Sequence, residues 1–478
     1  MKKRRRKNVL KAIKSAVQCI AFLCLLFFLI VRTYDALSWK DTLGDYISSV
    51  EQLYSTDDDM MDVVFTGSSH TYCSIVPALI WDETGIAAFN MTTSGQDKDS
   101  TYHYLVELLK TQSPEVVFVE LWGLTFDTHM VEGNVHRNMM GMPLSENSIA
   151  LIDDYVEDEE MNISYKLRWP IVHTRYKELD MYDFVTYDFS QYGRGVDLMY
   201  RSEPVSVSID GLTYFEADKL SETNQEWIEE LYQLSLDEDF ELVFFVAPTS
   251  VDSLQMGQIN GAAKFAEEHD IKFLDFNRMI NEVGIDYTTD FIDYCHLNGF
   301  GAEKLTSYLC DYMTENFDLE DHRGQKAYKQ WDDSYTRYVQ VREAAVLSQC
   351  QTFDAYVEQL KNMDNITTII SFEGQYEETP SSQPQLISWM LGMDEKAFKE
   401  GGTYIYKEGK LKKIIDNESD EIYIEELSEY NTLKIQNMEL ATDDIMINME
   451  ALGTSNDGVN FVVYDNFRNE VIDTRGFY

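Results

Sequence analysis

The distribution of apolar and polar residues divides the chain into segments of different character. An apolar run from Ser15 to Val31 comes first and is interrupted only by Gln18. From Asp62 to Asn316, short β-branched or aromatic runs alternate with stretches that have helical spacing, a pattern typical of parallel strands joined by helices. After His322 a long helical stretch is followed by short strand-like segments.

Five short apolar runs are predicted to be buried strands of one parallel sheet, covered by helices on both faces. They are Asp62–Thr66, Ile86–Asn90, Glu115–Trp122, Glu241–Ala247 and Ile271–Phe276. Helices are expected at Pro77–Thr84, Thr101–Thr111, Ser221–Ser235, Gln255–His269 and Gly299–Asn316. Pro77 suits the first position of a helix, and Gly85 suits the position just after its end. The middle of the chain is therefore predicted to be an α/β domain.

The remaining segments are predicted from where this alternation stops. An irregular insert over about 127–207 is interpreted as a lid, because long irregular segments inside ordered domains are usually functional. We expect a tail and anchor over 1–35, the α/β domain over 36–322, a helical connector over 323–349 and a β-rich domain over 350–478. In the last domain we expect strands at Ile366–Ser371, Thr403–Lys407, Glu421–Ile424 and Val459–Tyr464.

Charge separates a basic N-terminus from a strongly acidic remainder. The formal net charge is −45, and it includes eight positive charges within the first 14 residues, so the rest of the chain carries −53. Because nucleic-acid binding depends on neutralising phosphates, this balance excludes nucleic acid as a partner. It also disfavours docking of the whole acidic body on anionic lipid.

The apolar run that follows the basic tail is predicted to anchor the protein in a membrane. Its 17 residues lie at the short end of the length that spans a bilayer. The basic flank predicts a single-pass protein with a cytoplasmic N-terminus and its bulk outside. The alternative is a cleaved signal peptide ending near Ala36-Leu37-Ser38, although Arg32 and Asp35 count against cleavage. Both interpretations put the body outside the cytoplasm.

Candidate chemistry lies where two predicted strands end. The first strand ends in Thr66-Gly67-Ser68-Ser69-His70, at the sheet edge where ligands bind in α/β folds. A hydroxyl there becomes a nucleophile when a base is near and backbone amides stabilise the oxyanion. After the fifth strand, Asp293 and His296 stand three residues apart directly before the last helix. This spacing can place a carboxylate behind an imidazole.

A nucleophile after the first strand and a late D-x-x-H-L-N motif resemble the SGNH (GDSL-type) hydrolase family, with its flavodoxin-like five-stranded sheet. The resemblance is nearest to membrane-anchored bacterial members that act on cell-surface polymers. It implies that Ser69 is the nucleophile, His296 the general base and Asp293 its orienting partner. It also implies that the backbone amides of Ser69 and Gly95 form the oxyanion hole, with Gly95 in the segment Asn90–Gln96.

The chain departs from that family at the third strand, which ends in Glu120-Leu-Trp-Gly123 without the family's oxyanion-binding Asn. The same block is degenerate in related proteins of teichoic-acid D-alanylation and exopolysaccharide acetylation. The resemblance implies a serine esterase or O-acyltransferase, without metal or organic cofactor, on a cell-surface polysaccharide or cell-wall polymer. The alternatives are a non-catalytic glycan-binding scaffold, and a subunit recruited by cell-envelope biosynthesis proteins.

Several other residues are candidates for substrate contact. His70 adjoins the nucleophile, and Glu120 is either a site carboxylate or the partner of a buried Lys or Arg. Asp127 and His129 form a rival acid–histidine pair after the third strand.

A basic cluster in the insert offers forked guanidinium donors and an indole face to an anionic or sugar substrate, although packing alone would also explain it. Its members are Arg168, Trp169 and Arg175. Six cysteines show no spacing typical of a zinc site or redox pair, and a bridge between Cys73 and Cys295 is a further hypothesis.

The C-terminal segment carries a second resemblance. Residues 457–477 and the strand and turn at Thr403–Lys410 are similar to the interleukin-like EMT-inducer domain, a compact β-rich module. Some of its relatives bind carbohydrate, so the resemblance implies a glycan-docking role or, alternatively, a structural appendage.

Overall fold

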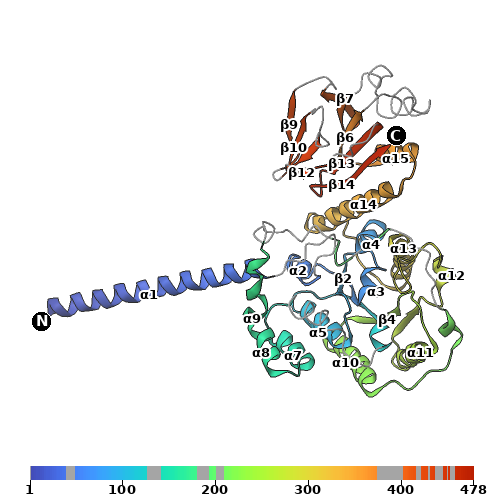
Figure 1. Ribbon diagram of the computed structural model, residues 1–478. Coiled ribbons are helices and arrows are strands. Elements are labelled where there is room, and N and C mark those ends of the chain that lie inside the picture. The colour runs from blue at the N-terminus through green and yellow to red at the C-terminus, as the bar shows by residue number, and fades with distance from the viewer. Residues whose placement is uncertain are drawn as a thin grey trace. The chain divides into compact units, whose positions relative to one another are not determined.

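The protein was analysed as a computed structural model (Figure 1) that describes residues 2–38, 49–125, 142–179, 193–196, 198–200, 209–373, 402–415, 421–428, 431–436, 445–448, 450–452 and 458–477. The chain divides into two compact units. The first unit comprises residues 1–75, 86–197 and 208–279, and the second comprises 76–85, 198–207 and 280–478.

A five-stranded parallel sheet forms the centre of the first unit. Its strands are β1 (Val63–Gly67), β2 (Ala88–Thr92), β3 (Val116–Glu120), β4 (Glu241–Val246) and β5 (Lys272–Asp275). The order is β2-β1-β3-β4-β5, so β1 lies between β2 and β3. Side chains of β1, β2 and β3 are buried throughout, as their continuous apolar runs predict. The predicted α/β class is confirmed.

The first unit contains helices of very different length, and several of them begin at a polar capping residue. They are α1 (Lys2–Leu37), α2 (Ser49–Tyr54), α3 (Ser69–Tyr72), α5 (Lys98–Leu108), α7 (Glu146–Tyr155), α8 (Glu159–Leu167), α9 (Trp169–Val172), α10 (Glu222–Glu238) and α11 (Ser253–Glu268), with 3-10 turns η1 (Leu121–Thr125), η2 (His173–Lys177) and η5 (Asp210–Thr213). Asp97, Ser221 and Asp252 cap α5, α10 and α11 by accepting backbone N–H groups of the first turn. Helix α5 packs against β1, β2 and α10.

The insert is more regular than its sequence predicts. Residues 146–177 form α7, α8, α9 and η2, so the expectation of an irregular segment is wrong there. Ser145 and Ser148 form a capping box at α7, and Asp158 caps α8. These caps and the burial of Leu151 and Ile152 stabilise the helices of the insert. The polar composition of the segment is why the sequence pattern did not predict them. Residues 126–141, 180–192 and 201–208 of the insert lie outside the described residues.

Part of the insert covers the edge of the sheet. Strand β2 is an edge strand, and the backbone N–H of Asn90 donates to the carbonyl of Arg194 at 2.9 Å. The side chain of Gln52 accepts the N–H of Gly195 at 3.1 Å, and Arg194 is fully buried. A covered edge satisfies backbone groups that would otherwise be open to pairing with another chain.

The second unit contains the remaining helices. They are α4 (Pro77–Thr84), α12 (Ile280–Val283), α13 (Gly299–Asn316), α14 (Lys329–Gln349) and α15 (Phe353–Asn362), with the 3-10 turn η6 (Lys326–Tyr328). Pro77 occupies the first turn of α4, and Gly85 ends it with a left-handed φ of 79°, as predicted. Helix α4 packs against α13 and α14.

Two antiparallel sheets form the C-terminal part of the second unit. One has the order β14-β13-β6-β7-β8 and the other β12-β11-β10-β9. Their bounds are β6 (Ile366–Glu373), β7 (Gly402–Lys407), β8 (Lys410–Ile415), β9 (Ile422–Glu426), β10 (Thr432–Gln436), β11 (Ile445–Ile447), β12 (Glu450–Ala451), β13 (Gly458–Asp465) and β14 (Glu470–Phe477). Ile369 and Val462 of the larger sheet share a buried core with Leu433 and Ile435 of the smaller one. A β-rich C-terminal region is confirmed.

The N-terminal helix α1 has the properties of a membrane span. Within it, Lys11–Leu37 is long and apolar enough to cross a bilayer, and no residue of its most apolar part is buried. A signal sequence has the same length and composition, so both interpretations stand. Figure 1 shows α1 as one continuous helix.

A matched pair of glycine substitutions tests the covered edge. Gly195 and Gly284 have nearly equal φ values of 80° and 78°. A Cβ at Gly195 would lie 2.0 Å from the carbonyl oxygen of Asn90, whereas one at Gly284 meets nothing within 4 Å. We expect Gly284→Ala to destabilise by about 1–2 kcal/mol through backbone strain, and Gly195→Ala by about 1–3 kcal/mol more. Equal thermal midpoints for the two variants would contradict this packing.

Candidate active site

The end of β1 presents two adjacent serines in different roles. Gly67 has a φ of 147°, and a Cβ added to it would lie 2.7 Å from the Cβ of Glu120, so only glycine fits there. The Ser68 hydroxyl caps α3 by accepting the backbone N–H of His70 at 3.3 Å. Ser69 is the first residue of α3 and is half-buried. Because the Ser68 hydroxyl already serves as the helix cap, Ser69 is the better candidate for the nucleophile.

The loop after β2 is tied to the end of β1. Strands β1 and β2 pair in parallel with Gly67 opposite Thr92, so the loops that follow them leave from the same edge. The side-chain amide of Gln96 donates to the Thr66 hydroxyl at 3.1 Å. Gly95 precedes it with a left-handed φ of 62°. This bond fixes the Gly95 loop beside the strand that carries Ser69.

A compact turn in the second unit carries Asp293 and His296. The N–H of Asn298 donates to the carbonyl of Asp290 at 2.9 Å, and the N–H of Ile292 donates to that of His296 at 3.1 Å. A bridge between Phe291 and Leu297 closes the turn. The Asn298 side chain caps α13 by accepting the N–H of Gly301, which explains the Leu-Asn of the motif as a structural element.

Asp293 holds the His296 ring from behind. Its Oδ1 accepts the backbone N–H groups of Cys295 and His296, each at 2.8 Å, and its Oδ2 lies 2.8 Å from Nδ1 of His296. Partial burial alone would raise the pKa of Asp293. The hydrogen bonds from the His296 ring and the Cys295 amide outweigh this effect, so the pKa lies below its usual value. The charged carboxylate favours the tautomer with the proton on Nδ1, which makes Nε2 the basic nitrogen.

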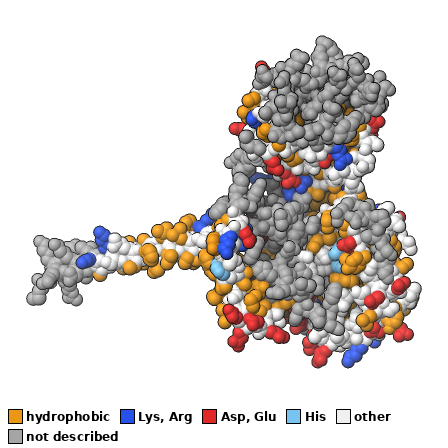
Figure 2. All heavy atoms as spheres, in the orientation of Figure 1, with side chains coloured by type: hydrophobic (Ala, Val, Ile, Leu, Met, Phe, Trp, Pro, Cys, Tyr) orange, Lys and Arg blue, Asp and Glu red, His pale blue; other side chains and the backbone are white. Residues whose placement is uncertain are grey.

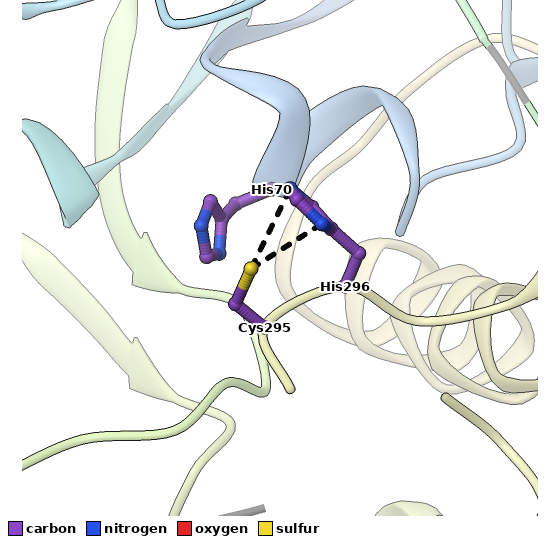
Figure 3. Close-up of side chains that lie close together, drawn as sticks. All are labelled: His70, Cys295 and His296. Carbon is purple, nitrogen blue, oxygen red and sulfur yellow. Dashed lines mark hydrogen bonds between the residues drawn. The ribbon is translucent and has the colours of Figure 1, made fainter. Parts of the chain in front are cut away.

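Cys295 lies against the same ring, a contact that the sequence did not predict. Its Sγ is 3.3 Å from Nδ1 of His296, as Figure 3 shows. Burial and the charge of Asp293 raise the pKa of Cys295 to about 12. Because the thiolate is the reactive form, this thiol is not a competing nucleophile at neutral pH. All six cysteines lie within described parts of the chain and are free thiols, so the hypothesis of a Cys73–Cys295 bridge gains no support.

Glu120 is a buried carboxyl group at the end of β3. Glu120 is 2% exposed, and among the described residues no side chain pairs with its carboxylate; the backbone amides of Trp122 and Ala247 approach it without well-aligned hydrogen bonds. Burial raises its pKa to about 8, and the backbone amides of Trp122 and Ala247 offset only part of that effect. The alternative of pairing with a buried Lys or Arg is not what the described residues show. Glu120 is therefore a neutral acid at pH 7.

Other buried polar groups follow the strands of the first unit, and the sequence analysis missed them. The hydroxyls of Thr71 and Thr249 and the side-chain N of Asn277 have no partner among the described residues. The backbone N–H of Thr249 donates to Oδ1 of Asn277 at 2.8 Å, which links the segments after β4 and β5. These residues come shortly after strands in the sequence, and that position could have marked them as candidates for the site. Polar groups at this edge suit a polar ligand.

The remaining candidates have observed contacts of their own. The His70 ring stacks on Trp122 with centroids 4.4 Å apart. Arg175 donates to the carbonyls of Leu37 and Ser38 at the end of α1, and Arg168 donates to the carbonyl of Met142. The Trp169 ring lies 6.2 Å from that of Tyr34.

Three sequence-based predictions stay predictions. Substrate contacts by Arg168, Trp169 and Arg175 have no support in the contacts just described. The rival pair Asp127 and His129 lies outside the described residues. The use of no metal or organic cofactor is likewise a prediction.

Each segment contains groups of a kind that a serine triad uses. One contains the half-buried Ser69, and the other contains an imidazole oriented by a carboxylate. No protein-family model matches the chain, and no curated protein matches it. The SGNH assignment therefore remains a hypothesis based on motifs and on the geometry of each segment.

The raised pKa of Glu120 predicts a pH-dependent stability. Between about pH 4.5 and 8 the unfolded carboxyl is ionised while the folded one stays protonated, so folding takes up a proton and stability falls as pH rises. We expect Glu120→Gln to flatten the fall of the thermal midpoint across this window. The control Glu115→Gln changes an exposed residue directly before the same strand and should leave the slope unchanged. Equal slopes for wild type and Glu120→Gln would refute a protonated Glu120.

Proposed function

We propose that this chain is a membrane-anchored, extracytoplasmic serine esterase or O-acyltransferase of SGNH type. Its substrate class is an acylated cell-surface polysaccharide or cell-wall polymer. The observation that carries the proposal is the Asp293–His296 pair, whose 2.8 Å contact and two backbone N–H bonds fix the ring with Nε2 as the base. The strand order β2-β1-β3-β4-β5, which is the flavodoxin-like order, supports it.

In the proposed reaction, the Ser69 Oγ attacks the acyl carbonyl carbon while Nε2 of His296 takes its proton. Asp293 stabilises the imidazolium, and the amides of Ser69 and Gly95 bind the oxyanion. The intermediate collapses to an acyl-serine, and His296 protonates the departing alcohol. Water or a glycan hydroxyl then attacks the acyl group and returns Ser69 to its starting form. A glycan acceptor makes the protein a transferase.

The other regions are assigned supporting roles in the same proposal. Helix α1 is the membrane anchor, with a cytoplasmic N-terminus and the bulk of the chain outside. The proposed role of the C-terminal sheets is to dock glycan, and cell-envelope biosynthesis proteins are the proposed partners.

A serine-directed fluorophosphonate probe tests the nucleophile. We expect the full-length protein in detergent to be labelled, Ser69→Ala to lose labelling and the matched neighbour Ser68→Ala to retain it, because Ser68 serves as a helix cap. In-gel fluorescence and mass spectrometry of the adduct provide the measurement. Equal labelling of Ser69→Ala and wild type would refute the nucleophile. No labelling of a folded wild-type protein would favour the glycan-binding scaffold.

The orienting role of Asp293 predicts a large kinetic effect with little structural change. Asp293→Asn removes the charge that favours the reactive tautomer, so the labelling rate should fall by about 10²–10⁴-fold. Asp318→Asn, an exposed control in the same unit, should label at the wild-type rate. A rate within threefold of wild type for Asp293→Asn would show that this carboxylate does not orient the base.

A further inference from the structure

The C-terminal end of α1 is fastened to the segment 159–177, which comprises α8, α9 and η2 and is called the platform here. A guanidinium nitrogen of Arg175 donates to the carbonyls of Leu37 and Ser38 at 3.1 and 2.6 Å. These carbonyls lie at the negative end of the helix dipole, where a cation is favourable. The Tyr34 and Trp169 rings are 6.2 Å apart. Helix α1 therefore leaves the first unit at the platform.

The platform exposes apolar side chains that a soluble surface would normally bury. Ile163 and Leu167 are 56% and 61% exposed, and Tyr176 is 64% exposed. Ile163 and Leu167 are four residues apart on α8, so they lie on one helix face. Clustered exposed apolar residues usually mark a surface that contacts a partner or a membrane.

The platform itself carries four basic residues, Lys166, Arg168, Arg175 and Lys177, against Glu159 and Glu160. Lys166 pairs with Asp153 of α7, and Asp158 caps α8 at the edge of the platform. Figure 2 shows Lys and Arg side chains where the apolar surface of α1 meets the first unit. The acidic body disfavours lipid contact in general, but a local excess of positive charge beside a membrane helix favours anionic headgroups.

The position of the platform along α1 matches the bilayer interface. The apolar run ends at Val31, and Tyr34 lies three residues further, which corresponds to about 4.5 Å along the helix axis. Trp169 is beside Tyr34 and is therefore within the headgroup layer when α1 spans the bilayer. Trp and Tyr are enriched at this level, and basic residues there reach lipid phosphates.

We propose that the platform is a second membrane contact, in which the exposed face of α8 and Trp169 insert into the headgroup layer of the outer leaflet that α1 crosses. The occupant of this surface is thus anionic phospholipid. The proposal rests on the membrane anchorage in the proposed function and is independent of the acyl-transfer chemistry. Two contacts would hold the first unit at a fixed tilt on the membrane.

Tryptophan quenching by lipid tests the contact. Full-length protein is reconstituted in phosphatidylglycerol–phosphatidylcholine vesicles with acyl chains brominated near the headgroup, in a Trp39→Phe background that removes a second indole next to the span in sequence. We expect Trp169→Phe to remove at least half of the lipid-dependent quenching. Trp227→Phe, which alters a tryptophan 3% exposed in α10, should leave it unchanged. Undiminished quenching in Trp169→Phe would overturn the proposal.

A second test leaves the Trp169 ring in place and changes a neighbouring exposed residue. Leu167→Glu places a charge on the exposed face of α8 and should reduce quenching of Trp169 at least twofold. The matched control Leu254→Glu changes an equally apolar side chain, 71% exposed on α11, and should have no effect. Equal quenching for both variants would overturn the proposal.

Failure of the membrane anchor and failure of the proposed chemistry can be told apart. Release of the protein from vesicles by alkaline extraction would refute the anchor, whereas loss of fluorophosphonate labelling alone would refute only the acyl-transfer chemistry.

Discussion

The parallel pairing of β1 with its neighbours is the constraint on which the first unit depends. Gly67 stands opposite Thr92 of β2, and Thr66 stands opposite Val119 of β3, so three chain segments leave the sheet at one level. That register places Ser69, the Gly95 loop and Glu120 at the same edge. A slip of one residue in β1 would turn each of its side chains to the opposite face and would remove the serine from this edge. The candidate chemistry is thus a consequence of strand packing.

The sequence predicts the strands and the late motif well, because both depend on local information. Buried parallel strands are continuous apolar runs, and the turn that presents His296 is closed by bonds between residues at most eight apart. Contacts between distant segments could not be predicted. The Gln96–Thr66 bond and the Asn90–Arg194 pairing join residues 30 and 104 positions apart, and no local pattern marks them. The helices of the insert were missed because their stability comes from caps and packing rather than from a strong apolar period.

Glu120 ends β3 with a buried carboxyl group. Burial raises its pKa to about 8 and so favours the protonated form at neutral pH, and a protonated carboxyl can donate a hydrogen bond. The basic and aromatic residues first considered for substrate contact instead contact the end of α1. In the proposal, catalysis and anchorage therefore use different residues.

The central claim is that Ser69 and the Asp293–His296 pair act on one substrate. A crystal structure of the full-length protein after reaction with a small fluorophosphonate tests it most directly. The account predicts a covalent adduct on the Ser69 Oγ, with the phosphonyl oxygen bound by backbone N–H groups and a His296 ring nitrogen within about 3 Å of the Ser69 Oγ. An unmodified Ser69, or an adduct whose environment lacks the His296 ring, would contradict the account.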